Sequence, residues 1–279
     1  MEKRPNNWLK IIMFKQRLLT TLILVPLVLM AIYYASVPVL GILVLLLTVL
    51  LGWEWSQLIP IKKPMYKCIF IAIMLLLIWP AVHWLHYWLL ADVIFWGLIL
   101  IAVLSYPASQ SVWGHRIIVG AGCLFLLPLV ASTMSSLYQQ TQGKDLIVYL
   151  LCLIWAADIG AYLAGKQWGR CKLIPRVSPG KTIEGSLGGI GLALLIAGVG
   201  FIYFKPEHVV TWFVVAALTA LVSMLGDLFI SMLKRRSQVK DTGNILPGHG
   251  GILDRLDSLI AALPLFYLAH TVHGISQGL

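Results

Sequence analysis

The segment Val39–Gly52 reads VLGILVLLLTVLLG and contains no charged residue. A second apolar segment, Leu18–Met30 (LLTTLILVPLVLM), precedes it. The same character extends over the whole chain of 279 residues, of which 59% are apolar and 11% charged, with a mean hydropathy of +0.88. Soluble domains carry about 25% charged residues. One water-soluble core of this size cannot bury so much apolar surface. The composition therefore excludes a soluble globular enzyme, a disordered chain and a disulfide-stapled secreted domain.

These apolar segments predict helices rather than strands. Only helices and closed barrels satisfy every backbone polar group in a bilayer, and barrel strands would be short and alternate in polarity. We therefore expect an all-α, polytopic integral membrane protein with about nine transmembrane helices. About 20 apolar residues cross a bilayer, which gives the following expected spans: 18–37, 38–58, 68–82, 87–104, 117–137, 146–165, 186–204, 208–230 and 257–274.

The chain is basic, with 21 Lys and Arg residues against 11 Asp and Glu residues and a net charge of +10. We expect no nucleic-acid partner, because basic residues in a membrane protein usually mark its cytoplasmic loops. If the N-terminus is cytoplasmic, nine spans place every basic residue except Lys144 and Lys205 on the inner side. The first span is followed by no A-x-A-type cleavage site, which favours an uncleaved anchor over a signal peptide.

Few polar residues in the first half suggest a function. Glu54 lies between Trp53 and Trp55 near the inner end of the second span. It is either an interfacial residue or a residue that lines a cavity, and both interpretations remain open. His83 and His86 lie among aromatic residues typical of an interfacial belt. The four cysteines have neither metal-site nor disulfide spacing.

The acidic residues, in contrast, concentrate in the second half, where seven of the eleven lie between Asp158 and Asp257. Ionisable groups inside spans are costly and usually mark function, and Asp158 and Asp227 both fall within spans, near the ends expected inside. Asp227, Ser231 and Lys234 follow the i, i+4, i+7 spacing of one helix face. This face could hold a metal and a phosphate together, or it could be the end of a helix that reaches water.

The loop after this helix adds anion-binding and metal-binding chemistry. The glycines of Pro247–Gly251 (PGHGG) let the backbone approach a ligand, and backbone N–H groups in such a nest bind anions. Asp254 and Asp257, at i and i+3, then share a helix face. Mg²⁺ usually takes one or two carboxylates plus substrate phosphates, and neighbouring lysines and arginines would contact those phosphates.

Two further clusters precede this loop. Arg176–Ser186 contains Gly-Lys-Thr, but Pro175 stands where a Walker A loop needs glycine, and we expect no strand before it. What remains is a lysine and hydroxyl groups at the start of the seventh span, where a helix N-terminus favours phosphate. Asp158–Arg170 places an aspartate above a basic loop. Together the clusters favour phosphoryl or nucleotidyl transfer to a lipid, a reaction that depends on positioning and charge neutralisation.

The residues of these clusters resemble a known family, the phosphatidate cytidylyltransferases (CDP-diacylglycerol synthases). The segment from Ser231 to Asp257 is similar to that family's pattern over its full length: S-x-L-K-R, K-D-x-G, L-P-G-H-G-G and L-D-R-L-D. Ser178–Gly185 and Asp158–Gly169 resemble two further blocks, with Ile159 and Lys166 as departures from the pattern. The first 150 residues or so are matched only by hydropathy and length.

The resemblance implies that CTP and phosphatidic acid react to give CDP-diacylglycerol and pyrophosphate, with Mg²⁺ and a second cation, K⁺, as cofactors. It implies Asp227 and Asp254 as metal ligands, with Asp158 and Asp257 as second candidates, and a homodimer in the bacterial inner membrane. The expected catalytic residues are Asp227, Asp254, Lys234, Ser231 and His249. The expected phosphate-binding residues are Ser178, Lys181, Thr182, Arg235, Lys240, Arg255, Gly250 and Gly251.

We accordingly divide the chain into an N-terminal transmembrane scaffold of about five helices, residues 1–145, and a catalytic transmembrane region, residues 146–279, with its active site at the cytoplasmic side. A transporter or lipid flippase is the alternative of another class. Against it, the two halves share no repeat and the charges gather at one face. A CDP-alcohol phosphotransferase is excluded because no aspartate between Asp158 and Asp257 precedes a glycine. A paralogue with a changed lipid acceptor stays open.

Overall fold

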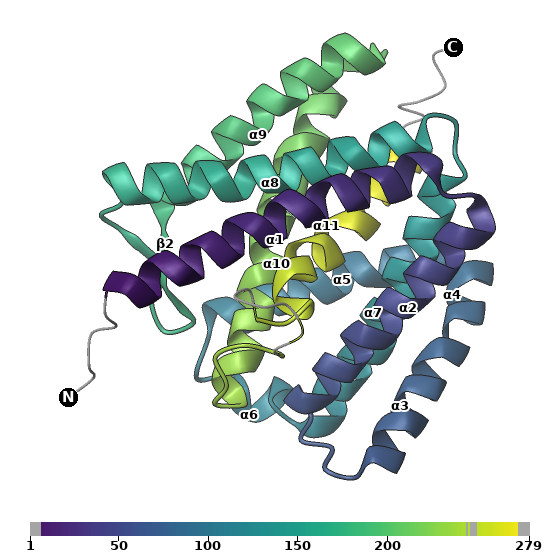
Figure 1. Ribbon diagram of the computed structural model, residues 1–279, viewed down its shortest axis with the longest axis vertical. Helices are drawn as coiled ribbons and strands as arrows, with labels where there is room; N and C mark the ends of the chain where they lie inside the picture. The colour runs from purple at the N-terminus through teal and green to yellow at the C-terminus, as the bar shows by residue number, and fades with distance from the viewer. Residues whose placement is uncertain (1–6, 244, 246–249, 273–279) are drawn as a thin grey trace.

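The computed structural model describes residues 7–243, 245 and 250–272. Helices dominate it, and Figure 1 shows them as a bundle around a central pair, α10 and α11. Their bounds are α1 Asn7–Tyr34, α2 Val37–Leu58, α3 Pro64–Leu76, α4 Ile78–His83, α5 Leu85–Leu104, α6 Gln110–Trp113, α7 Arg116–Tyr138, α8 Gly143–Trp168, α9 Ile183–Phe204, α10 Val209–Arg236 and α11 Leu253–Val272. The expected all-α class is confirmed.

Seven helical segments in the described part of the chain are long and apolar enough to cross a membrane. They are α2, the nearly continuous α3–α4 (Pro64–His83), α5, α7, α8, α9 and α10. The protein is therefore a multi-pass membrane protein. The first expected span lies in α1, whose described apolar part is Leu22–Tyr34, and the ninth lies in α11. The count of nine spans stays a prediction.

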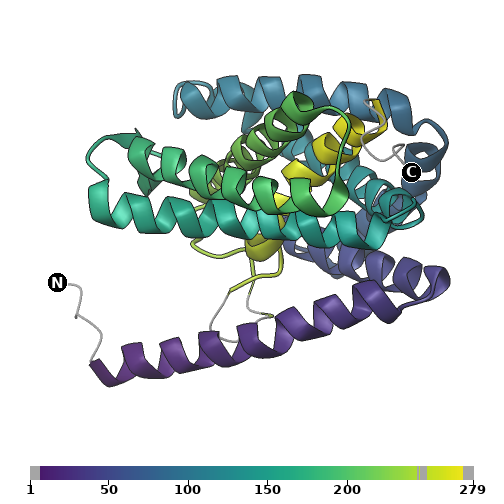
Figure 2. The ribbon, with the colours of Figure 1, turned by 90° about the horizontal axis from the view of Figure 1, so that it is seen from above.

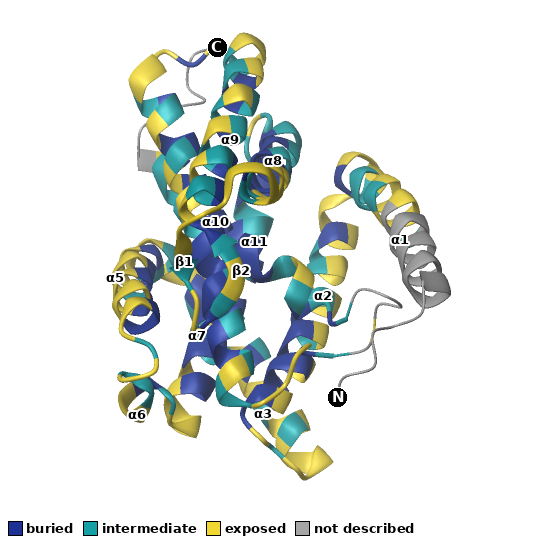
Figure 3. Cartoon of the chain, turned by 90° about the vertical axis from the view of Figure 1, so that its left-hand side faces the viewer, coloured by how far each residue is buried: buried dark blue, intermediate teal, exposed yellow. Residues whose placement is uncertain are grey.

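Buried side chains form two clusters, and the central helices belong to both. One cluster surrounds Trp55, Trp96 and Phe229, and the other surrounds Trp212 and Phe266. Figure 3 shows this buried material along α7, α10 and α11, with exposed positions on the outer helices. Large apolar side chains on those outer faces suit a hydrocarbon surround, because lipid tails are as apolar as leucine.

Helices α8 and α9 lie side by side in opposite directions (Figure 2), and glycines let them approach closely. A Cβ atom on Gly160 would meet the carbonyl oxygen of Gly188 at 2.5 Å, and one on Gly188 would overlap the Cβ of Ala164. Small residues at such crossings are typical of membrane helices, whose association depends on close packing.

Helix α1 lies apart from the bundle over much of its length (Figure 2) and is held at its C-terminal end. There the Tyr33 hydroxyl donates to Asp145 Oδ1 at 2.8 Å, and the Tyr138 hydroxyl donates to the carbonyl of Ala35 at 2.6 Å. Its attachment therefore involves the ends of α7 and α8 that lie opposite the hairpin described next.

The connection between α8 and α9 corrects one prediction. We expected no strand there, but β1 (Lys172–Ile174) and β2 (Ser178–Thr182) form an antiparallel hairpin that pairs Lys172 with Thr182. Strand β2 was not predicted because it contains Pro179 and Gly180, and proline and glycine are rare inside strands. The fully buried Val177 anchors the hairpin in the core. Gly-Lys-Thr therefore lies on a strand that leads into α9.

We predict that Gly188→Ala destabilises the protein by about 1–3 kcal/mol, the usual cost of adding a methyl group to a filled contact. The thermal midpoint in detergent should fall accordingly. Gly191→Ala is the matched control on the same helix, because a Cβ atom there meets nothing within 4 Å. Equal midpoints for the two variants would contradict the close α8–α9 contact.

Candidate functional site

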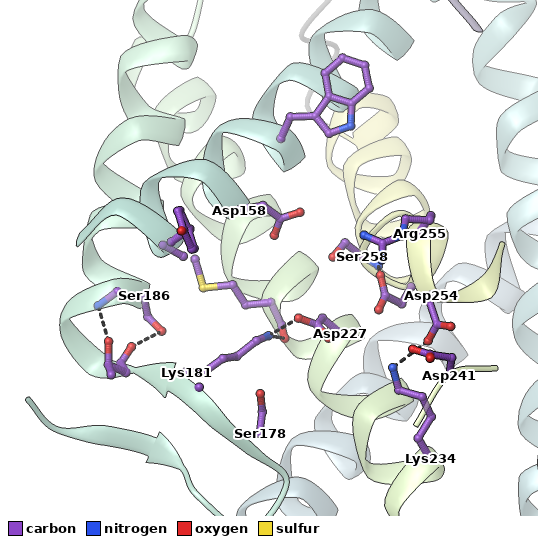
Figure 4. A pocket seen from close by; sticks show the side chains of 18 residues that line it. Asp158, Ser178, Lys181, Ser186, Asp227, Lys234, Asp241, Asp254, Arg255 and Ser258 are labelled. Carbon is purple, nitrogen blue, oxygen red and sulfur yellow. Dashed lines mark hydrogen bonds and ion pairs between the residues drawn. The ribbon is translucent and has the colours of Figure 1, made fainter. Parts of the chain in front are cut away.

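A cavity of about 680 Å³ opens among α8, β2, α9, α10 and the start of α11. Figure 4 shows the polar side chains that point into it from these elements. Segments far apart in sequence thus meet at one place. The predicted site residues that line the cavity are Asp158, Ser178, Lys181, Thr182, Asp227, Lys234, Asp254, Arg255 and Asp257.

Two ion pairs join residues in the wall of the cavity. Lys181 Nζ on β2 lies 2.7 Å from Asp227 Oδ2 on α10, and Lys234 Nζ on α10 lies 2.7 Å from Asp254 Oδ1 on α11. Lys181 also donates to the carbonyl of Met224 at 3.2 Å. Each pair joins two different elements, so the two lysines fix the hairpin and α11 against α10. Each ammonium also neutralises a carboxylate in a half-buried setting where an unpaired charge would be costly.

Asp254 is the most firmly held carboxylate in the cavity. Its Oδ2 accepts hydrogen bonds from Thr242 N at 2.8 Å, Thr242 Oγ1 at 3.0 Å and Gly251 N at 3.1 Å. It lies in the first turn of α11, where the helix dipole favours negative charge. Gly250 has φ +85°, a conformation natural to glycine. The described residues Thr242, Gly250 and Gly251 therefore surround this carboxylate.

Other predicted residues lie beside the cavity rather than along its lining. Ser231 donates to Asp227 Oδ1 at 3.2 Å, and Arg235 Nε donates to the carbonyl of Val177 in the hairpin at 3.2 Å. Lys240 is exposed. Gly250 and Gly251 pack behind Asp254 and Thr242. His249 lies outside the described residues.

Thr182 has a structural contact that the sequence analysis did not foresee. It is the N-cap residue of α9, and its hydroxyl accepts a hydrogen bond from Gly185 N at 3.1 Å. Its side chain is buried, although the residue also lines the cavity. The hydroxyl therefore satisfies a backbone donor of the first turn, the usual task of a threonine at this position.

The structure adds lining residues that the sequence analysis missed: Trp155, Tyr162, Ser186, Asp241 and Ser258. Trp155 and Tyr162 lie three residues before and four after Asp158, which is the spacing of one helix face. That spacing was a usable signal. Asp241 lies in the loop segment already quoted for the resemblance, one residue before Thr242.

Glu54 is fully buried and is not among the residues that line the cavity. The cavity-lining interpretation is therefore wrong for this cavity, whereas the interfacial one stays a prediction. The Glu54 carboxylate accepts hydrogen bonds from Ile252 N at 3.0 Å, Leu253 N at 2.8 Å and Thr242 Oγ1 at 3.1 Å. The sequence carried no signal for these contacts, because the partners lie at least 188 residues away.

The charges of the cavity suit a cation together with phosphates. Five aspartates line it against three basic residues, so the wall has an excess of carboxylates. In the described residues no group of three or more His, Cys, Asp or Glu side chains could hold a metal ion. Mg²⁺ usually takes one or two carboxylates and completes its shell with phosphate oxygens and water. The donor set therefore fits an ion bound together with a polyphosphate.

Comparison with known proteins gives one consistent result. The family model described as "Cytidylyltransferase family" matches residues 15–273. A phosphatidate cytidylyltransferase of Haemophilus influenzae is 37% identical over 283 residues, which cover 91% of this chain and 97% of that protein. One of Pseudomonas aeruginosa is 37% identical over 275 residues, covering 91% and 96%. One of Synechocystis sp. is 50% identical over 126 residues, covering 45% and 43%.

We predict that Thr182→Val lowers the free energy of unfolding by about 0.5–2 kcal/mol, because valine cannot accept the hydrogen bond from Gly185 N. Thr182→Ser should keep the bond and most of the stability. Thermal unfolding in detergent measures both variants. A valine variant as stable as the wild type would show that the cap contributes nothing.

Proposed function

The chain belongs to the cytidylyltransferase family, and from this we propose that it transfers CMP from CTP to phosphatidate, giving CDP-diacylglycerol and pyrophosphate. The observation that carries the proposal is the cavity in which Asp227, Asp254, Lys181 and Lys234 meet among membrane helices. Its carboxylates and ammonium groups suit cations and phosphates, and a position among apolar helices would suit a lipid substrate. The full-length relatives carry the name of this activity.

In the proposed reaction a phosphate oxygen of phosphatidate attacks the α-phosphorus of CTP. A new P–O bond forms there, while the bond from the α-phosphorus to the oxygen that bridges to the β-phosphorus breaks. Pyrophosphate leaves with that bridging oxygen and its electron pair. The attacking phosphomonoester is largely dianionic at pH 7, since its second pKa is about 6. No general base is needed, so we assign His249 to hydrogen bonding or to the shape of the loop.

The basic residues of the cavity would hold the phosphates. Lys181, Lys234 and Arg255 line it, and charge-assisted hydrogen bonds from such groups are strong in a partly desolvated site. Lys181 and Lys234 each contact a carboxylate, so phosphate binding would redistribute these contacts. Ser178 also lines the cavity and would add a hydroxyl donor. Arg235 and Lys240 are not among the lining residues and would reach only a phosphate that extends beyond the cavity.

We propose that Asp227 and Asp254 hold Mg²⁺, with Asp158 and Asp257 as further candidates for a second cation such as K⁺. Cations in this place would neutralise charge on the attacking and leaving oxygens. The excess of aspartates over basic residues in the cavity supports this assignment, because two polyanionic substrates would otherwise meet a wall with net negative charge. Ser231, which donates to Asp227, would orient that carboxylate.

We also propose that the protein lies in the bacterial inner membrane as a homodimer, with its N-terminus and its site on the cytoplasmic side. The distribution of basic residues supports this orientation. The N-terminal end of α1 and the hairpin with Lys181 point toward the same end of the bundle (Figure 1). CTP would then reach the site from the cytoplasm and phosphatidate from the inner leaflet.

The direct test uses the purified protein in detergent with phosphatidate, radiolabelled CTP and Mg²⁺. We expect label in the organic phase only when metal and phosphatidate are both present, and none after EDTA treatment. Release of pyrophosphate should match the label in amount. A folded protein that yields no organic label would contradict the proposed acceptor. Label that persists in EDTA would contradict the metal requirement.

We predict that Asp254→Asn abolishes turnover, a loss of at least about 100-fold, because a proposed metal ligand should matter more than the residues that support one. Expression should persist, while the thermal midpoint should fall because Lys234 loses its ionised partner. Glu207→Gln is the matched acid-to-amide control, since Glu207 is exposed and is not among the cavity residues. Near-wild-type turnover of Asp254→Asn would show that the metal assignment is wrong.

A further inference from the structure

Glu54 is a buried carboxylate that lies outside the motifs of the second half. It is 0% exposed and lies near the C-terminal end of α2. A buried carboxylate is tolerated only where it is hydrogen-bonded. Among the described residues its donors are Thr242 Oγ1, Ile252 N and Leu253 N, which belong to the loop before α11 or to its first residue. A helix from the first half therefore provides the anchor for this loop.

The two backbone contacts cap α11 from outside. The first amides of a helix lack partners within it, and a nearby residue usually accepts from them. At α11 the carboxylate of Glu54 is this acceptor: its Oε1 accepts a hydrogen bond from Ile252 N and its Oε2 accepts one from Leu253 N. Its negative charge also suits the positive end of the helix dipole. The start of α11 is thereby fixed against α2.

Thr242 connects Glu54 to the proposed metal ligand Asp254. Its hydroxyl lies 3.1 Å from Glu54 Oε2 and 3.0 Å from Asp254 Oδ2, so its single proton is shared between the two carboxylates. A Cβ atom on Gly251 would overlap both Thr242 Oγ1 and Glu54 Oε2, so only glycine fits between them. Oδ1 of Asp254 contacts Lys234 in the cavity. Glu54, Thr242, Asp254 and Lys234 therefore form one chain of polar contacts that ends at the cavity.

The end of α2 is itself rigidly attached, which suits it to a positioning task. Trp55 is buried and donates from Nε1 to the carbonyl of Val119 on α7 at 3.1 Å. The carbonyl of Leu58 accepts from Arg236 Nη1 at 2.9 Å and from Ser237 Oγ at 3.1 Å, at the end of α10. Sites held by such supporting contacts keep their geometry better than sites on loops alone.

We propose that Glu54 is a positioning residue: it orients Asp254 through Thr242 and the first turn of α11 without contacting substrate. The kinetic consequence rests on the proposed function, whereas the contact between Glu54 and the loop does not. Residues that support a metal ligand typically change activity or metal affinity by about 10–100-fold when removed. Glu54 should belong to this class.

The test compares Glu54→Gln with Asp92→Asn. Asp92 is likewise a buried carboxyl of the first half, but it lies on α5 and is not among the cavity residues. Glu54→Gln should lower kcat/KM about 10–100-fold and raise the Mg²⁺ concentration for half-maximal activity. Hydrogen–deuterium exchange at Ile252 and Leu253 should rise, while amides of α8 stay unchanged. Asp92→Asn should alter neither readout.

Thr242→Val provides a second route if Glu54→Gln fails to fold. It should reproduce the kinetic defect, and the double variant should be less impaired than the two separate losses combined, since both act through one network. Unchanged hydrogen–deuterium exchange at Ile252 and Leu253 in Glu54→Gln would overturn the proposal. An unchanged kcat/KM per folded molecule in either variant would overturn it as well. If the wild type shows no transferase activity, the proposed function fails, and the exchange measurement still decides whether Glu54 holds the loop.

Discussion

An ionised side chain inside a bundle of apolar helices needs an opposite charge or several hydrogen bonds, because its desolvation is costly. This constraint determines the arrangement around the cavity. Asp227 contacts Lys181, and Asp254 contacts Lys234. Lys181 reaches α10 only because the hairpin folds back against that helix, with Arg235 donating to Val177 at its turn. The positions of the hairpin and of α11 thus follow from the need to neutralise Asp227 on α10 and Asp254 on α11.

The same pairing has a consequence for the proposed reaction. Before substrate binds, each lysine neutralises a carboxylate, so neither Asp227 nor Asp254 carries an uncompensated charge. A phosphate that draws Lys181 or Lys234 toward itself leaves its former partner available for a cation. Polyphosphate and cation would therefore bind cooperatively, each compensating the charge that the other exposes.

Sequence patterns predicted those features that depend on local spacing. Long apolar runs located the helices, and the spacing of Asp227, Ser231 and Lys234 placed them on one helix. The resemblance also pointed to Asp254. Local patterns failed where the partners are distant: Pro179 and Gly180 concealed β2, the N-cap contact of Thr182 depends on where α9 begins, and Glu54 contacts residues at least 188 positions away. Trp155 and Tyr162 were predictable in principle, because they share a helix face with Asp158.

The first half of the chain is more than a support for lipid access. Its helix α2 contacts the loop before α11 through Glu54, receives hydrogen bonds from the end of α10 at Leu58, and is joined to α7 through Trp55. The two buried clusters also cross the expected boundary at residue 145, since α7, α10 and α11 contribute to them. The buried carboxylate of α2 accepts hydrogen bonds from Thr242, Ile252 and Leu253, which lie close to Asp254. The proposed chemistry of the second half therefore depends on packing from the first.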